Sequence, residues 1–374
     1  MSRFPLIIAT VISFVNGLDN GLGLTPQMGY NSWYDSQCNV NESLIRDTAS
    51  KIVELGLDKL GYKYINIDDC WADGRYTNGT VYAKVPEFNI TLKPLADYIH
   101  SLGLKFGVYT DRGTNTCAGR PGSHNYEEID AFTYAEWGVD YLKEDSCHAT
   151  GDHLEAYAEY AKMRDALNNT GRPIFFSLCG WNEWYTQIGM SLGNSWRIGS
   201  DDGNWNAILS DIDNNGNNPN EKYSGPGGWN DPCLLVGTNM EGKAMITLQQ
   251  SKAQFSMWAV MTAPLLISSD IINMGQEYID IYSNKYIIDV NQDKMGKQGT
   301  RIYGESLLDG NNPSKNGVNI WSKELIDGSR AMVFINVGTN NTDIKCDAKC
   351  FENAGFYYNI SVKVYDLWNN NKYI

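Results

Sequence analysis

The sequence is constrained most strongly by one unit that recurs from Gly29 to about residue 270: a short apolar run, then polar or acidic residues, then a helical pattern. Strands that alternate with helices pair in parallel, and eight of them are the number that closes a (β/α)8 TIM barrel. The repeat therefore predicts an α/β fold with a closed barrel rather than an open, doubly wound sheet. Eight runs are predicted strands: residues 28–33, 64–69, 104–110, 139–145, 174–179, 195–200, 228–234 and 264–268.

Helical patterns occupy intervals between these runs, at residues 42–60, 95–102, 126–137, 154–167 and 244–259. Pro94 suits the first turn of one helix, and Gly61, Gly103 and Gly171 stand where helices are expected to end. The asparagine-rich residues 214–220 are predicted to form a polar loop without assignable chemistry.

The pattern changes after about Gly296, where short β-type runs follow one another without helices between them. Such runs, separated by Gly, Asn, Asp and Lys turns, predict an antiparallel β-sandwich that covers one side of the barrel. We therefore expect a barrel domain over residues 18–295 and a C-terminal antiparallel β domain over residues 296–374. The predicted strands of the second domain are residues 301–303, 317–322, 330–337, 356–364 and 364–368.

The first residues resemble a secretory signal. Arg3 precedes an apolar stretch over residues 4–15 that is too short to span a bilayer, and Asn16 and Gly17 offer a cleavage point. This predicts a signal peptide over residues 1–17 and a secreted or lysosomal protein. Six N-glycosylation sequons agree with that compartment, although an asparagine-rich sequence also produces them by chance: Asn41, Asn78, Asn89, Asn168, Asn340 and Asn359.

The charge and the cysteines exclude several classes of partner. A net charge of -14 without any basic run argues against nucleic acid, and no later apolar run is long enough for a membrane span. The eight cysteines show no CxxC or His-interleaved spacing, which favours disulfides over a metal site. Cys346 and Cys350 are close enough in sequence to staple one loop. The predicted chemistry requires neither a metal nor another cofactor.

The most informative single stretch is residues 141–147 (YLKEDSC), an apolar strand that ends in charged residues. The carboxyl ends of barrel strands carry the active site, and alternate side chains of a strand share a face. Lys143 and Asp145 therefore face one side and Glu144 the other. We interpret Asp145 as a nucleophile with Lys143 beside it on the substrate side. A solvated strand end with an ordinary ion pair is the alternative.

The predicted strand ends together supply carboxylates, two cations and aromatic rings, which is the composition of a carbohydrate site. Two of the carboxylates could break a glycosidic bond, with retention if they lie about 5 to 5.5 Å apart. A Ser-His-Asp triad is not supported, because the histidines fall in loops or in a helix pattern. The set comprises Trp33, Asp68, Asp69, Tyr109, Asp111, Lys143, Asp145, Arg197, Asp201 or Asp202, and Asp231.

Four motifs occur in the same order as in a known family: residues 18–33 (LDNGLGLTPQMGYNSW), 64–71 (YINIDDCW), 116–123 (TCAGRPGS) and 229–232 (WNDP). They resemble the α-galactosidases of glycoside hydrolase family 27, the melibiases. The resemblance extends from residue 18 into the C-terminal β module. It implies a (β/α)8 barrel followed by an antiparallel β domain, and a retaining exo-glycosidase that releases terminal α-D-galactose from oligosaccharides or glycoconjugates.

The resemblance also implies roles for individual residues. Asp145 matches the nucleophile, and Asp201 matches the acid/base because it follows Arg197 by four positions. The segment before Trp205 is one residue shorter than the family pattern, so Asp202 stays an alternative. The remaining residues match family positions that bind the substrate. Asp68 and Asp69 match the pair that binds the 4- and 6-hydroxyls of galactose, and Lys143 and Arg197 match residues that bind ring hydroxyls. Tyr109 matches an aromatic residue that lines the pocket, and Trp33 matches the tryptophan under the sugar. Two disulfides also follow, Cys38 with Cys70 and Cys117 with Cys147.

Retaining catalysis needs an ionised nucleophile and a protonated acid. We therefore expect Lys143 and Arg197 to lower the pKa of Asp145, and the pKa of Asp201 to be higher. Three residues depart from the family pattern: Glu144 beside the nucleophile, Gly180, and Cys233, for which a bond to Cys179 is a speculative option. Gly180 lacks a side chain that could recognise the sugar at C2. An α-N-acetylgalactosaminidase, a β-L-arabinopyranosidase and a noncatalytic sugar-binding barrel therefore remain alternatives, and a homodimer remains open.

Overall fold

The protein is described by a computed structural model that covers residues 20–217, 222–315, 317–356, 361–369 and 371–373. The predicted signal peptide, residues 1–17, lies outside the described residues, as does part of the predicted strand 356–364. None of the helices in the described ranges is both long and apolar enough to cross a membrane.

The barrel is a nine-stranded parallel sheet with the order β10-β11-β1-β2-β5-β6-β7-β8-β9. Its two end strands, β9 and β10, are consecutive in the chain and separated by only three residues. β9 pairs with β8 while β10 pairs with β11, so this stretch joins the two ends of the sheet and closes it. The strands are β1 (Met28–Asn31), β2 (Tyr64–Asn66), β5 (Lys105–Asp111), β6 (Tyr141–Asp145), β7 (Phe175–Leu178), β8 (Ser195–Arg197), β9 (Trp229–Asp231), β10 (Leu235–Val236) and β11 (Leu265–Ser268).

The predicted barrel is confirmed, because each of the eight predicted runs overlaps one of these strands. The run at 228–234 differs, since it contains only β9, and β10 begins after its end, at Leu235. Pro232 has no N–H for the ladder, and Cys233 adopts a φ of 129°, so regular pairing stops there. A hairpin of β3 (Ala72–Arg75) and β4 (Val81–Ala83) was not predicted.

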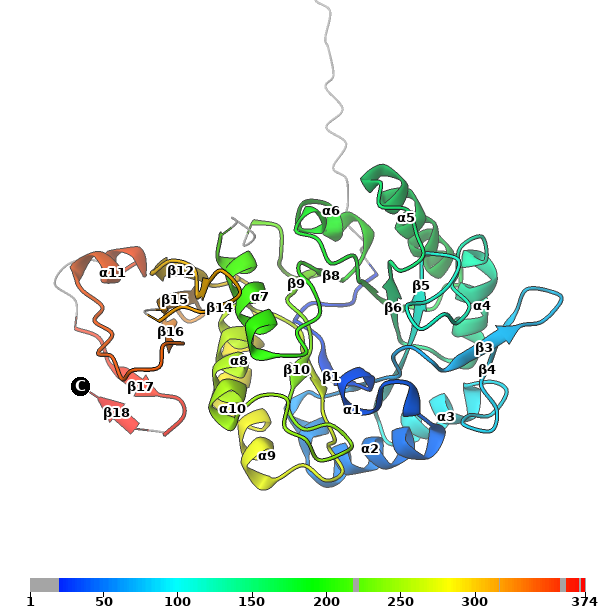
Figure 1. Ribbon diagram of the computed structural model, residues 1–374, viewed down its shortest axis with the longest axis horizontal. Coiled ribbons are helices and arrows are strands. Elements are labelled where there is room, and N and C mark those ends of the chain that lie inside the picture. The colour runs from blue at the N-terminus through cyan, green and yellow to red at the C-terminus, as the bar shows by residue number, and fades with distance from the viewer. Residues whose placement is uncertain (1–19, 218–221, 316, 357–360, 370, 374) are drawn as a thin grey trace, which may run out of the picture.

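Helices surround the ring of strands (Figure 1). Local sequence explains several helix starts: the Asn41 side chain accepts a hydrogen bond from the Leu44 N–H at the start of α2, and Thr247 and Gln250 form a capping box on α8. The bounds are α1 (Trp33–Ser36), α2 (Glu42–Glu54), α3 (Lys93–Ser101), α4 (Glu127–Trp137), α5 (His153–Asn169), α6 (Trp184–Leu192), α7 (Trp205–Asn217), α8 (Leu248–Val260), α9 (Gln276–Tyr282) and α10 (Lys285–Asn291).

Helix α7 corrects the prediction of a polar loop for residues 214–217, while residues 218–220 of the predicted loop lie outside the described residues. The helix runs to Asn217, and its buried face carries Ile208, Leu209 and Ile212. The asparagines that suggested a loop continue a helix whose packing is set by these earlier apolar residues, so tertiary burial outweighs the low helix propensity of asparagine.

The C-terminal module lies on one flank of the barrel, beside α7 and α8 (Figure 1). Its main sheet is antiparallel, in the order β12-β15-β16, and two smaller two-stranded sheets accompany it. A short helix, α11, lies within the module, so the expectation that its strands follow one another without helices is wrong. The elements are β12 (Thr300–Tyr303), β13 (Leu308–Asp309), β14 (Asn312–Pro313), β15 (Val318–Glu324), β16 (Arg330–Asn336), α11 (Ala348–Asn353), β17 (Val364–Asp366) and β18 (Asn371–Tyr373).

Polar contacts fasten this module to the barrel. Asp213 of α7 accepts hydrogen bonds from Arg301 at 2.9 Å and from the Leu307 N–H at 2.7 Å. The buried Lys323 of β15 donates to the carbonyl of Val290 at 2.5 Å, at the C-terminal end of α10. Burial lowers the pKa of Lys323 to about 7, so the amine acts here as a buried hydrogen-bond donor whether or not it is charged. The contacts lie on the outer helices, so they hold the module against the barrel wall.

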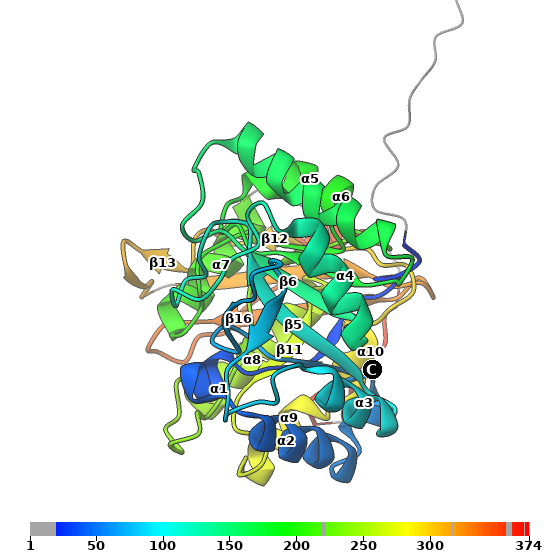
Figure 2. The ribbon, with the colours of Figure 1, turned by 90° about the vertical axis from the view of Figure 1, so that its right-hand side faces the viewer.

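Strands β5 and β6 run side by side in Figure 2, and the two faces of β6 differ in their exposure to solvent. Lys143 of β6 is partly accessible, whereas the next residue, Glu144, has 0% exposure. Neither carboxyl oxygen of Glu144 has a hydrogen-bond partner. Burial and the charges of Asp111, Glu127 and Glu159 raise the pKa of Glu144 well above its ordinary value, while Arg112 opposes the rise. Glu144 is therefore a buried, uncharged acid.

Replacing Glu144 by glutamine should stabilise the protein more at pH 7 than at pH 4.5. The folded protein keeps the proton on Glu144, but the unfolded chain releases it above its ordinary pKa, so folding loses stability as the pH rises. Glu144→Gln removes this proton uptake and should increase the free energy of unfolding by up to about 3 kcal/mol at pH 7. Urea denaturation at both pH values measures the difference.

The exposed Glu136 on α4 provides the matched control. Glu136→Gln should leave the free energy of unfolding nearly unchanged at both pH values. An equal effect of Glu144→Gln at pH 4.5 and pH 7 would show that Glu144 does not take up a proton on folding.

Candidate active site

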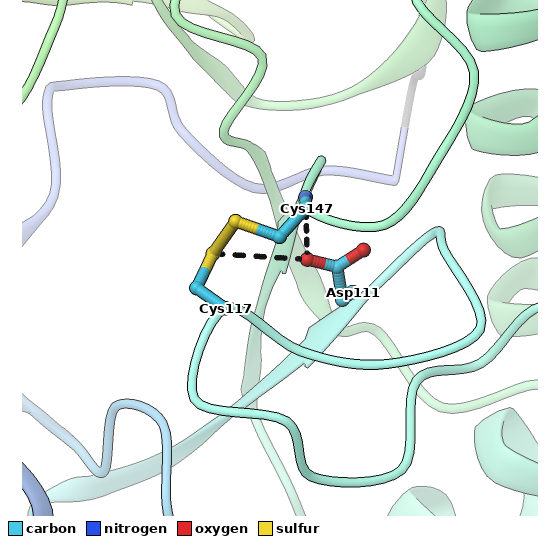
Figure 3. Close-up of side chains that lie close together, drawn as sticks. All are labelled: Asp111, Cys117 and Cys147. Atoms are coloured by element: carbon cyan, nitrogen blue, oxygen red, sulfur yellow. Dashed lines mark hydrogen bonds between the residues drawn. A yellow bond between two sulfur atoms is a disulfide. The ribbon is translucent and has the colours of Figure 1, made fainter.

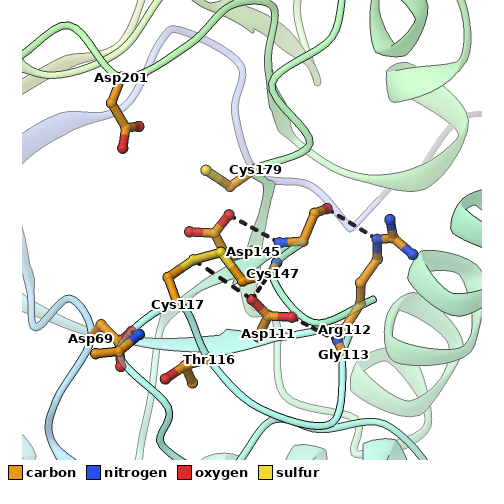
Figure 4. The surroundings of a disulfide bond; sticks show 12 residues. Asp69, Asp111, Arg112, Gly113, Thr116, Cys117, Asp145, Cys147, Cys179 and Asp201 are labelled. Atoms are coloured by element: carbon orange, nitrogen blue, oxygen red, sulfur yellow. Dashed lines mark hydrogen bonds between the residues drawn. A yellow bond between two sulfur atoms is a disulfide. The ribbon is translucent and has the colours of Figure 1, made fainter. Parts of the chain in front are cut away.

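Asp145 ends β6 and lies at the carboxyl end of the barrel (Figure 4). Its side chain accepts two hydrogen bonds from uncharged donors: the Tyr109 hydroxyl to Oδ2 and the Ser146 N–H to Oδ1, both at 2.9 Å. Tyr109 lies on the neighbouring strand, where it pairs with Lys143. Asp145 is only 5% exposed. Both carboxyl oxygens are thus held in fixed positions by the strand and its neighbour.

Lys143 forms an ion pair with Asp68, which follows β2. Its Nζ lies 2.8 Å from Asp68 Oδ2, and the same oxygen accepts a hydrogen bond from Asn31 Nδ2 at 2.7 Å. Burial would lower the pKa of Lys143, but the charges of Asp68, Asp145 and Asp201 raise it well above the ordinary value. Lys143 is therefore charged and lies within electrostatic reach of both predicted catalytic carboxylates. The sequence-based prediction did not include Asn31, which lies inside the predicted strand 28–33 and ends β1.

Asp69 is fixed by backbone donors. Its Oδ2 accepts from the Ala118 N–H at 2.8 Å and its Oδ1 from the Cys70 N–H at 2.6 Å. Burial raises the pKa of Asp69, and these hydrogen bonds oppose the rise. Both donor residues stand beside or within disulfides, since the structure contains the bonds Cys38–Cys70, Cys117–Cys147 and Cys346–Cys350. The first two disulfides therefore anchor loops that hold Asp69.

Arg197 and Asp201 form a second ion pair, with Nη1 3.2 Å from Oδ1. The guanidinium of Arg197 is buried, and its Nη2 also donates to the Ser200 carbonyl at 2.6 Å. The Asp201 side chain is 56% exposed, and its carboxyl group points toward the side on which Asp145 lies (Figure 4). Asp202, in contrast, is 0% exposed and accepts a hydrogen bond from Gln254 at 3.0 Å. Of the two, only Asp201 has an accessible carboxyl group.

The pKa values in the free site run opposite to the sequence-based expectation. Burial raises the pKa of Asp145 to about 6, because the opposing effect of Lys143 is smaller. For Asp201, burial acts upward, but the charges of Arg197 and Lys143 hold the pKa below its ordinary value. The expectation was wrong because Arg197 pairs with Asp201 and not with Asp145. Which aspartate the arginine contacts depends on the loop after β8.

Asp111 is buried at the end of β5, where it pairs in register with Asp145 of β6. It accepts hydrogen bonds from the N–H groups of Gly113 at 2.7 Å and Cys147 at 2.8 Å. Its Oδ2 also lies 3.9 Å from Sγ of Cys117 (Figure 3). Asp111, Cys117 and Cys147 are close enough together to suggest a metal site, but the disulfide engages both sulfur atoms and leaves no thiolate. Asp111 instead braces the loop that follows Asp145.

The other predicted residues border this region. Trp33 begins α1 and is partly buried, and Asp231 ends β9 directly opposite Arg197. The speculated bond between Cys179 and Cys233 is absent, because both are buried free thiols, and Sγ of Cys179 lies 3.7 Å from Arg197 Nη1. A side chain added at Gly180 would come within 2.0 Å of the Tyr185 ring, so Tyr185 fills the space beside this glycine.

Comparison with known proteins agrees with this geometry. Residues 25–293 match the family model described as "Alpha galactosidase A", and residues 315–374 match the "Alpha galactosidase C-terminal beta sandwich domain". A protein of Dictyostelium discoideum named "Probable alpha-galactosidase" is 46% identical over 346 residues, which cover 91% of this chain and 85% of the relative. An α-galactosidase of Cyamopsis tetragonoloba is 41% identical over 356 residues, covering 94% and 82%.

Solved structures show the same similarity. The α-galactosidase of Saccharomyces cerevisiae, determined with raffinose, superimposes with a TM-score of 0.82 at 35% identity, covering 95% of this chain and 84% of that one. A β-L-arabinopyranosidase of Geobacillus stearothermophilus shares the fold, with a TM-score of 0.79 at 20% identity, covering 94% and 92%. The chain therefore belongs to the α-galactosidases of glycoside hydrolase family 27.

Proposed function

We propose that this protein is a retaining exo-α-galactosidase that releases terminal α-D-galactose by double displacement, with Asp145 as nucleophile and Asp201 as acid/base. The observation that carries the proposal is the arrangement of these two carboxyl groups. Asp145 is held by uncharged donors, and Asp201 is accessible to solvent. The negative charges of both aspartates raise the pKa of Lys143. The relatives are named for the same activity.

In the first step, an oxygen of Asp145 forms a bond to C1 of galactose while the bond from C1 to the leaving oxygen breaks. Asp201 gives its proton to that oxygen. In the second step, a water molecule gives a proton to Asp201 and its oxygen attacks C1, and the ester bond to Asp145 breaks. Two inversions at C1 restore the original configuration.

Substrate binding must also reverse the order of the two pKa values. When Arg197 donates to a ring hydroxyl of the sugar, Asp201 loses part of its ion pair, and the sugar shields Asp201 from water. Both changes raise the pKa of Asp201. A sugar hydroxyl that donates to Asp145 favours the charged form of the nucleophile. The charge states that the first step needs are thus expected in the complex and not in the free enzyme.

The proposed binding residues surround the two catalytic groups. Asp68 and Asp69 accept from the 4- and 6-hydroxyls of galactose, and Lys143 and Arg197 donate to ring hydroxyls. Trp33 covers the apolar sugar face and Tyr109 lines the pocket. Selectivity for galactose over N-acetylgalactosamine is supported by Tyr185, which occupies the space beside Gly180. A contact between the Asp68–Asp69 pair and the 6-hydroxyl favours galactose over arabinopyranose, which lacks that group.

We also propose residues 18–295 as the catalytic domain and residues 296–374 as the β domain, in agreement with the two family matches. A secreted or lysosomal location is supported by the disulfides, which persist in oxidising compartments. An α-galactoside oligosaccharide or glycoconjugate is the proposed substrate.

The purified protein should hydrolyse nitrophenyl α-galactoside faster than the corresponding α-N-acetylgalactosaminide and β-L-arabinopyranoside at mildly acid pH. Asp145→Asn should reduce kcat on the α-galactoside at least about a thousandfold, because the amide cannot form the ester intermediate. Chromogenic assays on all three glycosides measure both effects. Faster turnover of another glycoside would reassign the substrate, and undiminished activity of Asp145→Asn would eliminate the nucleophile.

The acid/base assignment can be tested by comparing Asp201→Ala with Asp202→Ala. Loss of the acid/base leaves a glycosyl-enzyme that a small anion can attack without a general base. Added azide should therefore accelerate Asp201→Ala and yield α-galactosyl azide, because azide replaces water in the second inversion at C1. Mass spectrometry detects the azide product. Asp202→Ala should mainly lose stability because Asp202 is buried. Azide rescue of Asp202→Ala alone would reverse the assignment.

A further inference from the structure

The loop that follows the proposed nucleophile is fastened by one buried arginine, Arg112, which comes directly after β5. Its Nε donates to Ser146 Oγ at 3.0 Å and its Nη2 to the Thr150 carbonyl at 2.7 Å. Its Nη1 forms an ion pair with Glu159 of α5. Arg112 is 4% exposed. The planar guanidinium thus fixes both ends of residues 146–150 against a helix of the barrel.

Arg112 reaches Asp145 through Ser146, without touching the sugar site. The Ser146 hydroxyl lies between Arg112 Nε and the Tyr160 hydroxyl, which is 2.8 Å away. With its side chain held at these two points, the Ser146 backbone N–H donates to Asp145 Oδ1 at 2.9 Å. The Arg112 N–H also donates to the Asp145 carbonyl at 3.0 Å. Arg112 therefore holds Asp145 in two ways: its own N–H binds the Asp145 carbonyl, and its side chain holds Ser146, whose N–H binds the Asp145 carboxylate.

The position of Asp145 Oδ1 bears directly on the reaction. In a double displacement one oxygen of the carboxylate must approach C1 in line with the leaving group, and the other must be held by a donor. Tyr109 constrains Oδ2 and Ser146 constrains Oδ1. If Ser146 loses its side-chain contacts, the peptide that carries its N–H is held mainly by the bond from the Arg112 N–H to the Asp145 carbonyl, and the N–H is aimed less strictly at Oδ1. The carboxylate then spends less time in the reactive geometry, while the groups that bind the sugar stay in place.

We propose that Arg112 is a positioning residue that aims the carboxylate of Asp145 through Ser146. The inference rests on the proposed function, since it takes Asp145 as the nucleophile. It predicts a defect in the rate of chemistry with little change in sugar affinity. A merely structural arginine would change protein stability and leave the rate of the folded enzyme alone.

Arg172 serves as the matched control, because it contacts the residues just before β6, at the end of that strand opposite Asp145. Like Arg112, it donates hydrogen bonds both to a carboxylate, that of Asp140, and to backbone carbonyls, those of Gly138 and Val139. These contacts hold the segment that leads into β6 at the end far from Asp145. Arg172→Met should therefore reduce stability but leave the catalytic rate within about twofold of the parent.

The test measures kcat/KM on nitrophenyl α-galactoside, the inhibition constant of galactose, and the melting temperature of each variant. Arg112→Met and Ser146→Ala should each reduce kcat/KM about 10- to 100-fold, with the inhibition constant of galactose within about twofold. Arg112→Lys keeps the charge but not the planar fork, so it should recover only part of the rate. If Arg112→Met does not fold at the assay temperature, Arg112→Lys and Ser146→Ala carry the same test.

The double variant Arg112→Met/Ser146→Ala decides whether the two residues act together. If Arg112 works through Ser146, the double variant should be no slower than the slower single variant, because the effects are not additive. Multiplied losses, full activity of Ser146→Ala, full recovery by Arg112→Lys, or an equal loss in Arg172→Met would each overturn the inference. Asp145→Asn distinguishes the two proposals: if it stays active, the assignment of the nucleophile fails, whereas an inactive Asp145→Asn beside a fully active Arg112→Met defeats only this inference.

Discussion

Parallel pairing all the way around a closed sheet is the constraint on which the site depends. Because every barrel strand runs in the same direction, the carboxyl ends of all strands meet at one mouth. Closure is achieved by the stretch from Trp229 to Val236, whose two halves pair with strands on opposite sides. Residues as far apart in sequence as Asn31 and Asp231 thereby end on the same rim. Without closure, the carboxylates at the two ends of the sheet would not lie at the same mouth.

The charges at this rim are distributed unevenly. Lys143 pairs with Asp68 and Arg197 pairs with Asp201, so each cation neutralises a carboxylate other than Asp145. Asp145 receives hydrogen bonds from a phenol and a backbone amide instead. A direct salt bridge would stabilise the carboxylate more strongly and make it less reactive. Uncharged donors fix its position, while burial raises its pKa to about 6 against the opposing effects of Lys143 and of these donors.

A second layer supports the catalytic strand from behind. Asp111 accepts from the Cys147 N–H, the disulfide Cys117–Cys147 joins two loops, and Arg112 contacts the segment after Asp145. Loops lack the backbone ladder that orders strands, so side chains and a covalent bond supply the order here. The buried Glu144 points into the same layer without a hydrogen-bond partner. The rigidity of the loop therefore comes from residues that do not face the sugar.

The sequence by itself determined the kind of fold and the set of chemical groups. Local periodicity fixed the strands and most of the helices that were predicted, and their polar ends supplied Asp68, Asp145, Lys143 and Arg197, because alternation and strand direction are short-range properties. Only the tertiary structure decided the partners of these groups: Asp201 and Asp202 are adjacent and chemically identical, yet one is accessible and the other is buried. The same holds for the free thiols of Cys179 and Cys233, the inward position of Asp111 and the order of the two pKa values. Partner choice depends on which distant strands and loops become neighbours, and burial and charge at each carboxyl group follow from that packing.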